Sequence, residues 1–294
     1  MLPYSPEGLS VQQPTEEALR RGADTGEIFQ AKCIKCDEHH NLHVDLGRIR
    51  GLIPKAETAI GISDGSTREI AVLSRVGKQV SFQVLAFDYQ GNAILSRKAA
   101  QLEARSYFLS ALRPGDIIPA VVQNPLAFGV FCDIGCGFPA LMRIDRCCVS
   151  RLQTSAERFS PGQPIYAAIA NINELEGRID LTCRELLGTW AENAALFRPG
   201  QTVTGIVRSV MAYGVFVELT PNLSGLAEPG FDVKPGDSVI VYIRSILADK
   251  HKIKLTILEK LPGPVCTPPL HFFRTEGHIG TWEYYPGSRT VTVF

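Results

Sequence analysis

Four side chains near the N-terminus have the types and the close spacing of a metal site. Cys33, Cys36, His40 and His43 lie within eleven residues, and cysteine thiolates and histidine nitrogens are the usual zinc ligands. Their spacing is much tighter than that of a zinc finger, and alternation along two paired strands would direct the side chains to different faces. We therefore expect a polar hairpin turn without a metal, and a zinc site is the alternative.

Two further motifs have the form of catalytic or cofactor sites. Residues 61–65 match the Gly-x-Ser-x-Gly pattern of hydrolase nucleophiles, with Ser63 at its centre. That pattern requires a strand before the serine and a helix after it, whereas the surroundings here predict a loop. Residues 135–140 resemble a dinucleotide fingerprint but lack the helix that should follow. We expect no enzyme and no cofactor, and a metal-dependent or hydrolytic enzyme remains the alternative.

A gapless internal repeat organises the elements around these residues. Residues 112–131 match residues 197–216 at an offset of 85, with eight identical positions in twenty. Both segments open with an Arg-Pro-Gly turn and then alternate at a period close to two, which is typical of half-buried strands. A more divergent third copy lies upstream, where residues 51–54 align with the later copies. Such self-similarity indicates tandem copies of one domain.

Each copy is expected to contain five short strands. The many glycines and prolines, 26 and 19 in number, favour turns between short strands over long helices. A closed antiparallel barrel removes exposed strand edges. We therefore predict an all-β fold with three five-stranded barrels in tandem and a C-terminal β-hairpin around residues 285–288.

The segments between the copies are rich in Ala, Leu and Glu and lack internal proline, which predicts linker helices. A short helix is also expected from Glu16 to Arg21, with Thr15 as its N-cap and Gly22 at its end. The predicted organisation is an N-terminal segment (1–24), a first barrel (25–97), a linker helix (98–112), a second barrel (113–183), a second linker helix (184–197), a shortened third barrel (198–261), and a Pro-rich linker with the hairpin (262–294).

The opening and closing strands of the copies carry a family resemblance. Residues 213–219 read Tyr-Gly-Val-Phe-Val-Glu-Leu after a Gly-x-Val repeat, and residues 178–182 read Arg-Ile-Asp-Leu-Thr. An aromatic-Gly-x-Phe-Val-x-Leu strand and a closing Arg-Ile-x-Leu-Ser strand are typical of S1 RNA-binding domains. Over about residues 25–261 the chain resembles the tandem S1 domains of the bacterial ribosomal protein S1 family.

The resemblance implies OB-fold barrels that bind single-stranded RNA, such as mRNA, near the small ribosomal subunit. In that family aromatic rings stack on bases, while nearby basic groups contact phosphates. Carried over to this chain, the expected RNA-binding residues are the stacking aromatics Phe128, Phe131, Tyr213 and Phe216, the basic residues Arg143, Arg178 and Lys252, and the polar partners Asn173 and Asp249. Burial of Phe131 and Phe216 in the barrel core is the alternative reading for those two residues.

The chain also departs from the family pattern. A histidine that often follows the Gly-Leu of the third strand is replaced by Pro54, Arg143 and Glu228 in the three copies. The first copy has His40 and His43 where the aromatic pair belongs. We expect the second copy to be the most complete site, the third copy to come next, and the first copy to be structural.

The charge balance tempers the RNA interpretation. Thirty basic and thirty acidic residues give no net charge, whereas phosphate-binding proteins usually carry an excess of Lys and Arg. Any nucleic-acid site must be a local patch, and weak binding by each barrel would be raised by linkage. The alternative is a scaffold or regulatory protein whose S1 domains act through protein partners.

Composition further limits the class of protein. No apolar run is long enough to cross a bilayer, and residues 1–10 lack the pattern of a signal peptide. Eight cysteines without an export signal indicate reduced thiols. We expect a cytoplasmic protein with no membrane partner and no small-molecule substrate.

Overall fold

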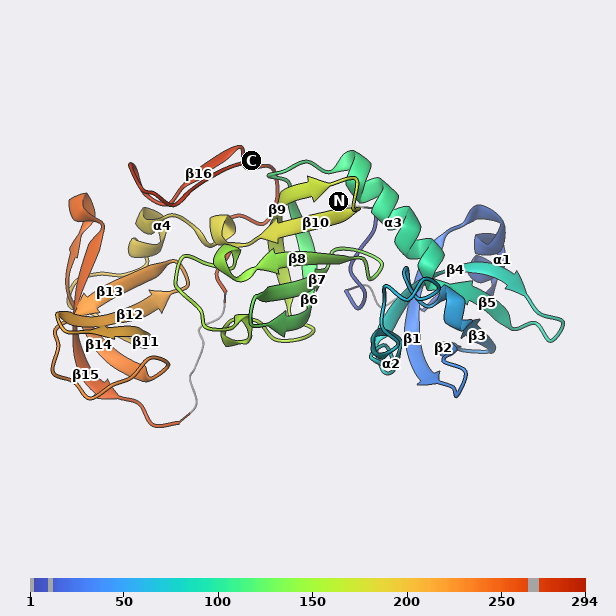
Figure 1. Ribbon diagram of the computed structural model, residues 1–294, viewed down its shortest axis with the longest axis horizontal. Coiled ribbons are helices and arrows are strands. Elements are labelled where there is room, and N and C mark those ends of the chain that lie inside the picture. The colour runs from blue at the N-terminus through green and yellow to red at the C-terminus, as the bar shows by residue number, and fades with distance from the viewer. Residues whose placement is uncertain (1–2, 10–12, 264–269) are drawn as a thin grey trace.

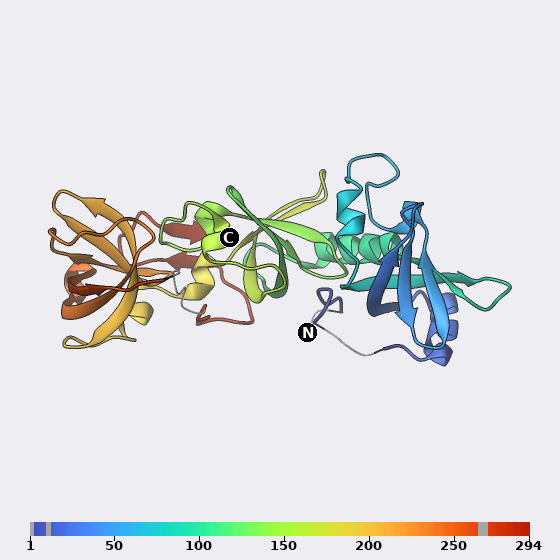
Figure 2. The ribbon, with the colours of Figure 1, turned by 90° about the horizontal axis from the view of Figure 1, so that it is seen from below.

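The computed structural model describes residues 3–9, 13–263 and 270–294. Three closed five-stranded barrels lie in a row, with barrel one at one end, barrel two in the middle and barrel three at the other end (Figures 1 and 2). This arrangement confirms the predicted all-β fold with three tandem barrels. Part of the expected Pro-rich linker, residues 264–269, lies outside the described residues.

The three barrels share one topology, in which the third strand pairs in parallel with the fifth and the other neighbours are antiparallel. Barrel one contains β1 (Ile28–Cys36), β2 (Leu42–Leu46), β3 (Ile49–Ile53), β4 (Gln79–Phe87) and β5 (Ala93–Ser96), with η1 (Lys55–Glu57) and α2 (Ile70–Leu73) between β3 and β4. Barrel two contains β6 (Ile117–Leu126), β7 (Gly129–Asp133), β8 (Pro139–Arg143), β9 (Pro164–Asn173) and β10 (Arg178–Thr182), with η2 (Ile144–Arg146) and η3 (Ser155–Glu157). Barrel three contains β11 (Thr202–Met211), β12 (Gly214–Thr220), β13 (Leu223–Ala227), β14 (Ser238–Leu247) and β15 (Lys252–Lys260), with η5 (Ala248–Lys250).

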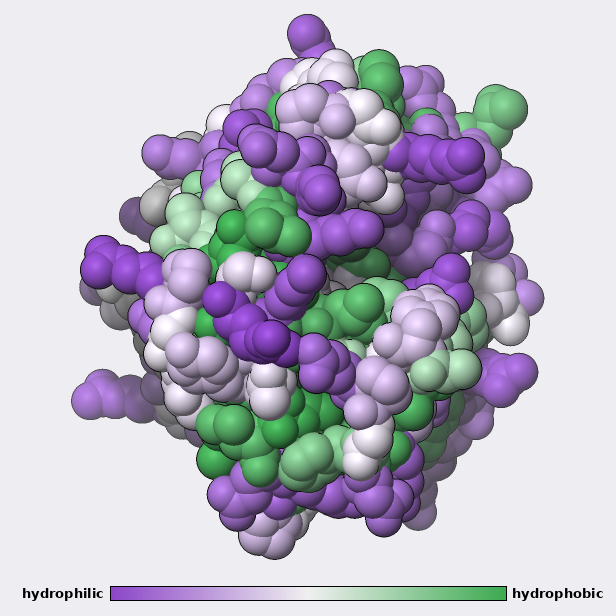
Figure 3. All heavy atoms as spheres, turned by 90° about the vertical axis from the view of Figure 1, so that its left-hand side faces the viewer, coloured by the Kyte–Doolittle hydropathy of each residue, from purple (hydrophilic) through white to green (hydrophobic). Residues whose placement is uncertain are grey.

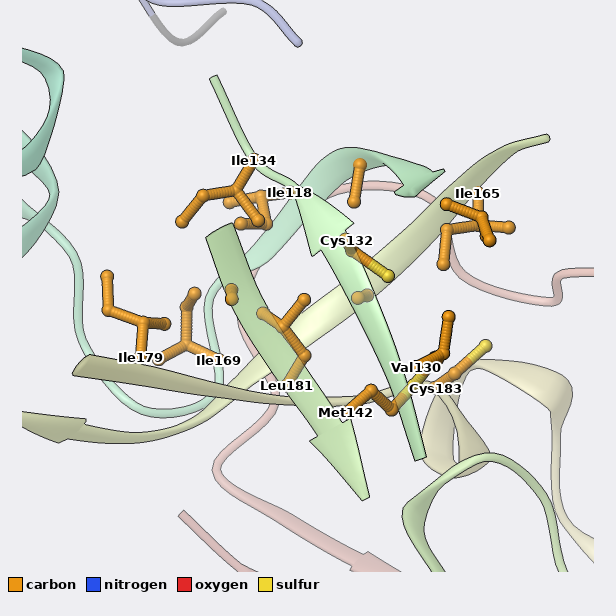
Figure 4. Close-up of a cluster of buried hydrophobic side chains, with 14 of the residues drawn as sticks. Ile118, Val130, Cys132, Ile134, Met142, Ile165, Ile169, Ile179, Leu181 and Cys183 are labelled. Atoms are coloured by element: carbon orange, nitrogen blue, oxygen red, sulfur yellow. The ribbon is translucent and has the colours of Figure 1, made fainter. Parts of the chain in front are cut away.

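Strand alternation fills each barrel with apolar side chains. In β7, Val130 and Cys132 are fully buried while Phe131 between them is only partly buried. In β10, Ile179 and Leu181 point inward in the same way. Figure 4 shows these side chains converging with those of the other strands in the interior of barrel two. Each large aliphatic side chain buried in this way stabilises the fold by about 1.5–3 kcal/mol.

The helix α1 (Glu16–Thr25) begins at the expected N-cap Thr15, but the prediction that it ends at Gly22 is wrong. Gly22 is buried inside the helix, where a β-carbon would collide with the ring of Phe29. The helix ends four residues later at Gly26, whose φ of 72° closes the C-terminus in the left-handed conformation. The glycine at position 22 thus provides close packing, and the glycine at position 26 provides the stop.

The first linker helix is α3 (Arg97–Ala111), which begins at the N-cap Ser96. Ala100, Ala104 and Phe108 on its buried face belong to the core cluster of barrel two. The helix therefore leaves β5 of barrel one directly and packs against the next barrel, as the ribbon shows (Figure 1).

The second linker is not the single helix that we predicted for residues 184–197. It consists of η4 (Arg184–Leu187) and α4 (Trp190–Ala194), separated at Gly188. Gly188 has a φ of 85°, which breaks the helix, and the ring of Phe273 packs where a β-carbon would lie. Asn222 of barrel three holds the break by donating hydrogen bonds to the carbonyl oxygens of Arg184 and Gly188.

The N-terminal segment joins barrels one and two. The carboxylate of Glu7 is buried and accepts hydrogen bonds from Arg97 at 2.7 and 2.9 Å, and from the backbone N–H of Ser81 at 3.0 Å. The backbone N–H of Glu7 donates to Asp133 of barrel two at 2.8 Å. Arg75 of barrel one approaches the same carboxylate at 3.4 Å.

The C-terminal segment braces barrels two and three. Its strands β16 (Thr281–Glu283) and β17 (Val291–Val293) form the expected antiparallel hairpin. Trp282 packs with Leu186 of the linker in one buried cluster, and Tyr285 stacks on His251 of barrel three with ring centroids 4.2 Å apart. No helix in the described ranges is long and apolar enough to span a membrane.

Candidate nucleic-acid interface

An aromatic pair lies on the outer surface of barrel two. Phe131 lies in the middle of β7 with its ring on the outside, and Phe128 lies in the turn that precedes the strand. The ring centroids are 6.3 Å apart with an interplanar angle of 85°, so the rings meet edge to face. Phe128 is 56% exposed. Its ring is therefore accessible for stacking on a base.

Gly129 lets this pair approach the neighbouring strand. A β-carbon there would collide with the backbone oxygen of Met142 and would lie 3.0 Å from the Cα atom of Arg143. A bulge beside a glycine helps to present both rings on one face. The register shift of this strand pair lies in the facing strand β6, between Val122 and Asn124.

Phe131 belongs to a row of outward-facing residues that crosses all five strands of barrel two. It lies opposite Asn124 of β6 and Leu141 of β8. Leu141 pairs with Asp180 of β10, which in turn pairs with Asn171 of β9. The row offers a ring, an apolar side chain, two amides and a carboxylate, and it contains no basic residue.

Barrel three repeats this arrangement with a different charge. The rings of Tyr213 and Phe216 are 6.2 Å apart at 90°, and Tyr213 is 65% exposed. Lys254 occupies the position that corresponds to Asp180 of barrel two, because it pairs with the equivalent leucine of the third strand. The full row is Ser209, Phe216, Leu226, Lys254 and Ser245. Figure 3 faces the barrel-three end and shows apolar side chains gathered between polar ones.

Barrel one has a histidine at the corresponding position. His43 of β2 lies opposite Lys35 and Leu52, as the phenylalanines do in the other barrels. A ring nitrogen of His43 is 3.1 Å from the carboxylate of Asp37. His40 corresponds to Phe128 in sequence spacing and lies 3.5 Å from Glu69. Carboxylates thus engage both histidines in this barrel.

The predicted basic residues of barrel two lie at opposite edges of its outer face. Arg143 follows the row at the end of β8 and pairs with Asp145 at 3.1 Å. Arg178 begins β10 at the other edge and pairs with Glu176 at 2.9 Å. All four side chains are more than half exposed. Such exposed pairs contribute little energy, so a phosphate can compete for either arginine.

The predicted polar partners lie in the closing turns. The side-chain oxygen of Asn173 accepts a hydrogen bond from the backbone N–H of Glu176, which stabilises the turn between β9 and β10. Asp249 lies in η5 and Lys252 begins β15, and both are exposed. These residues border the aromatic faces, and they do not meet in one compact cluster with the rings.

Sequence reasoning did not single out Asp180 and Lys254. Each lies two residues after a predicted basic residue, so the period of two along a strand places it on the same outer face. That signal was available in the sequence. Glu228, which stands in place of the family's histidine in the third copy, is paired with Arg244 at 2.5 Å.

The alternative zinc site at Cys33, Cys36, His40 and His43 is not formed. Cys33 is fully buried in the core of barrel one, and the Cys36 thiol donates to the carbonyl oxygen of Asp37. The histidines face the carboxylates described above. Within the described part of the chain, no three His, Cys, Asp or Glu side chains gather as a metal site.

The cysteines of barrel two are packed in its interior. Burial raises the pKa of the Cys132 thiol to about 12, and the pKa of Cys136 is raised to about 12 for the same reason. Their thiols therefore stay protonated and inert at neutral pH. Ser63 lies within a run of turns, with neither the strand nor the helix of a hydrolase elbow beside it.

Three OB-like barrels with corresponding outer faces define the chain as a tandem OB-fold protein. Residues 23–98, which include all of barrel one, match the sequence model of the S1 RNA binding domain. The chain thus contains an S1 domain and is similar to the bS1 proteins described next, which confirms the resemblance to the S1-like family expected from its sequence.

Two curated relatives illustrate the similarity. The small ribosomal subunit protein bS1 of Staphylococcus aureus (strain COL) is 30% identical over 262 residues, which cover 83% of this chain and 65% of that protein. The small ribosomal subunit protein bS1 homolog of Bacillus subtilis (strain 168) is 26% identical over 83% of this chain and 66% of its own length. The chain therefore spans about two thirds of the length of these relatives.

Among solved structures, the chain matches a multidomain protein with nucleic acid binding domains from Streptococcus pneumoniae. The two are 15% identical, the match covers 79% of this chain and 73% of the other, and the TM-score is 0.27.

Proposed function

We propose that this chain binds single-stranded RNA through the outer faces of barrels two and three. In this proposal the chain catalyses no reaction. The observation that carries the proposal is the exposed ring that stands beside a second, half-buried ring at corresponding places in both barrels. Unstacked bases offer their faces to such rings, and stacking contributes about 1–3 kcal/mol per base. Phe128 and Tyr213 are the outer rings, and Phe131 and Phe216 support them from below.

The basic and polar residues at the edges of these faces would contact the RNA backbone. Arg143 and Arg178 serve barrel two in this proposal, and Lys252 serves barrel three. Asn173 and Asp249 shape the closing turns next to these groups and offer polar atoms to sugars and bases. Because the chain has no net charge, we expect modest affinity for each barrel and stronger binding when two barrels engage one strand.

The two bS1 relatives suggest which RNA and which partner the chain binds. Both are named as proteins of the small ribosomal subunit. We therefore propose mRNA as the ligand and the small ribosomal subunit as a partner, which would place the protein in the cytoplasm.

The test is binding of a labelled single-stranded RNA of about 20 nucleotides, long enough to engage at least one barrel. We expect the double variant Phe128→Ala, Tyr213→Ala to bind more weakly by about 1–3 kcal/mol per lost stack. Tyr242→Ala is the matched control, because Tyr242 is a partly exposed tyrosine on β14 of barrel three, away from β12 and β13. Equal affinity of the double variant and the wild type, with both folded, would remove these rings from the site.

A scaffold role is the second candidate. It is favoured by the absence of net charge on the chain, because proteins that bind phosphate groups usually carry an excess of Lys and Arg. RNA contacts release counterions, so true RNA binding loses affinity steeply as salt rises. Cosedimentation with small ribosomal subunits, together with no binding of free RNA at micromolar protein, would favour the scaffold.

A further inference from the structure

A groove of about 420 Å³ lies between barrels one and two, beside the linker helix α3. Its basic lining residues are Arg75, Arg97, Arg105 and Arg178. Glu176 is the single acidic residue among the described residues that line it. Such an excess of arginine over acid is typical of a site for phosphate groups.

Two of these arginines are positioned by the buried carboxylate of Glu7. Arg97 is buried and makes two hydrogen bonds to Glu7, and Arg75 lies 3.4 Å from the same carboxylate. One carboxylate thus faces two guanidinium groups at the floor of the groove. These arginines are fixed in position, and the nearby carboxyl groups of Glu7 and Asp133 balance part of their combined charge.

Arg105 has a different environment. It projects from α3, is partly buried, and its guanidinium lies against Gly177 in the turn between β9 and β10, where a β-carbon would collide with it. Gly177 has a φ of 60°, which lets this turn approach the helix. Among the described residues no hydrogen bond or ion pair to the Arg105 side chain is found. Arg105 is therefore a positioned cation with its donors available.

The groove adjoins the outer face of barrel two. Leu141 and Asp180 are paired in parallel strands, so Pro139 and Arg178, two residues earlier, lie on the same face one step toward barrel one. Both residues also line the groove. A strand that crosses the ring of Phe131 and leaves over Arg178 enters the groove directly.

We propose that the groove binds a backbone phosphate of the RNA strand that crosses barrel two, with Arg105 as its main contact and Arg178 at its entrance. This inference rests on the proposed RNA binding and extends it beyond the barrel to the linker helix. This path gives a role to Arg105 on the helix between the two barrels, where its guanidinium lies against the closing turn of barrel two.

The test compares Arg105→Ala and Arg105→Lys with the wild type in binding of the same RNA of about 20 nucleotides at several salt concentrations. We expect Arg105→Ala to bind about threefold to tenfold more weakly, and its slope of log K against log salt to fall by about 0.7, the value for one phosphate on a single strand. Arg105→Lys keeps the charge and should retain the slope. Arg48→Ala is the control, because Arg48 is exposed in the turn between β2 and β3 and does not line the groove.

Failure of this inference is distinguishable from failure of the proposed function. If the wild type binds RNA and Arg105→Ala has the same affinity and slope, the groove is not part of the RNA path. If the wild type binds no RNA, both the proposed function and this inference are wrong.

Inorganic pyrophosphate tests the other source of phosphate. Pyrophosphate binding that depends on Arg105, with RNA binding unaffected by Arg105→Ala, would assign the groove to a free phosphate compound and overturn the RNA path.

Discussion

At the scale of single residues, the outer faces of barrels two and three differ most at one position. Asp180 in barrel two and Lys254 in barrel three each pair with the leucine of the third strand, beside the central phenylalanine. A carboxylate there repels a phosphate, whereas an ammonium group attracts it. Barrel three therefore has the more favourable charge for backbone contacts, although its sequence is the shorter of the two.

The exchange of these two charges is a direct test. We expect Asp180→Lys to strengthen RNA binding by about 0.2–1 kcal/mol, the range for exposed charge interactions, and Lys254→Asp to weaken it by a similar amount. Both affinities should be measured at several salt concentrations, because each added phosphate contact steepens the dependence on salt. Lys254→Arg serves as the charge-preserving control. A salt dependence that stays the same in Asp180→Lys would place the strand elsewhere on the barrel.

At the scale of elements, the sequence predicted the strands well because their alternation is set by burial inside each barrel. It also predicted the aromatic pairs, which follow the repeat. It failed at Gly22 and Gly188, where the role of the glycine depends on contact with a phenylalanine ring of another segment. The sequence also did not predict a role for Arg105, because its neighbour Gly177 lies 72 residues further along the chain. Such contacts depend on tertiary packing that local patterns do not encode.

The break in the second linker leads to a stability prediction. Gly188→Ala should lower the free energy of unfolding by about 1–3 kcal/mol, because alanine is strained at a φ of 85° and its methyl group would collide with Phe273. Thermal unfolding of the full chain measures the change. Gly236→Ala is the control, since Gly236 has a φ of 95° but no atom within 4 Å of the methyl group that alanine would add. A loss no larger than in this control would show that the contact with Phe273 does not matter.

At the scale of the whole molecule, buried charges join the barrels. Arg158 and Glu218 form an ion pair at 2.6 Å that is fully enclosed between barrels two and three, and Arg208 binds the same carboxylate at 2.8 Å. Removal of one partner from such a pair leaves an uncompensated charge and typically costs about 3–5 kcal/mol. The orientation of neighbouring barrels, and with it the path of a bound strand, is therefore fixed by specific side chains.

The junction between barrels one and two has an acid of unusual pKa. Burial, and next to it the charge of Glu7, raises the pKa of Asp133 to about 7, although three backbone N–H groups donate to its carboxyl oxygens. In the unfolded chain an aspartate ionises near a pH of about 4. The folded chain thus holds a proton that the unfolded chain releases, so the contribution of Asp133 to stability falls as the pH rises from about 4 to 7. Glu7 has the opposite sign, because its folded pKa lies below its ordinary value and its contribution is lost only in acid.

The contribution of Asp133 is therefore measurable between about pH 5 and 7, where the contribution of Glu7 no longer changes. We expect the melting temperature of the wild type to decrease, relative to that of Asp133→Asn, as the pH rises through this window, because asparagine does not titrate. The comparison cancels the histidines, which both chains share. Asp145→Asn, at an exposed carboxylate, is the control and should follow the wild type. Parallel curves for the wild type and Asp133→Asn would mean that Asp133 is ionised in the folded chain, with its three N–H bonds outweighing burial. The junction would then be held by two carboxylates and two arginines with no proton between them.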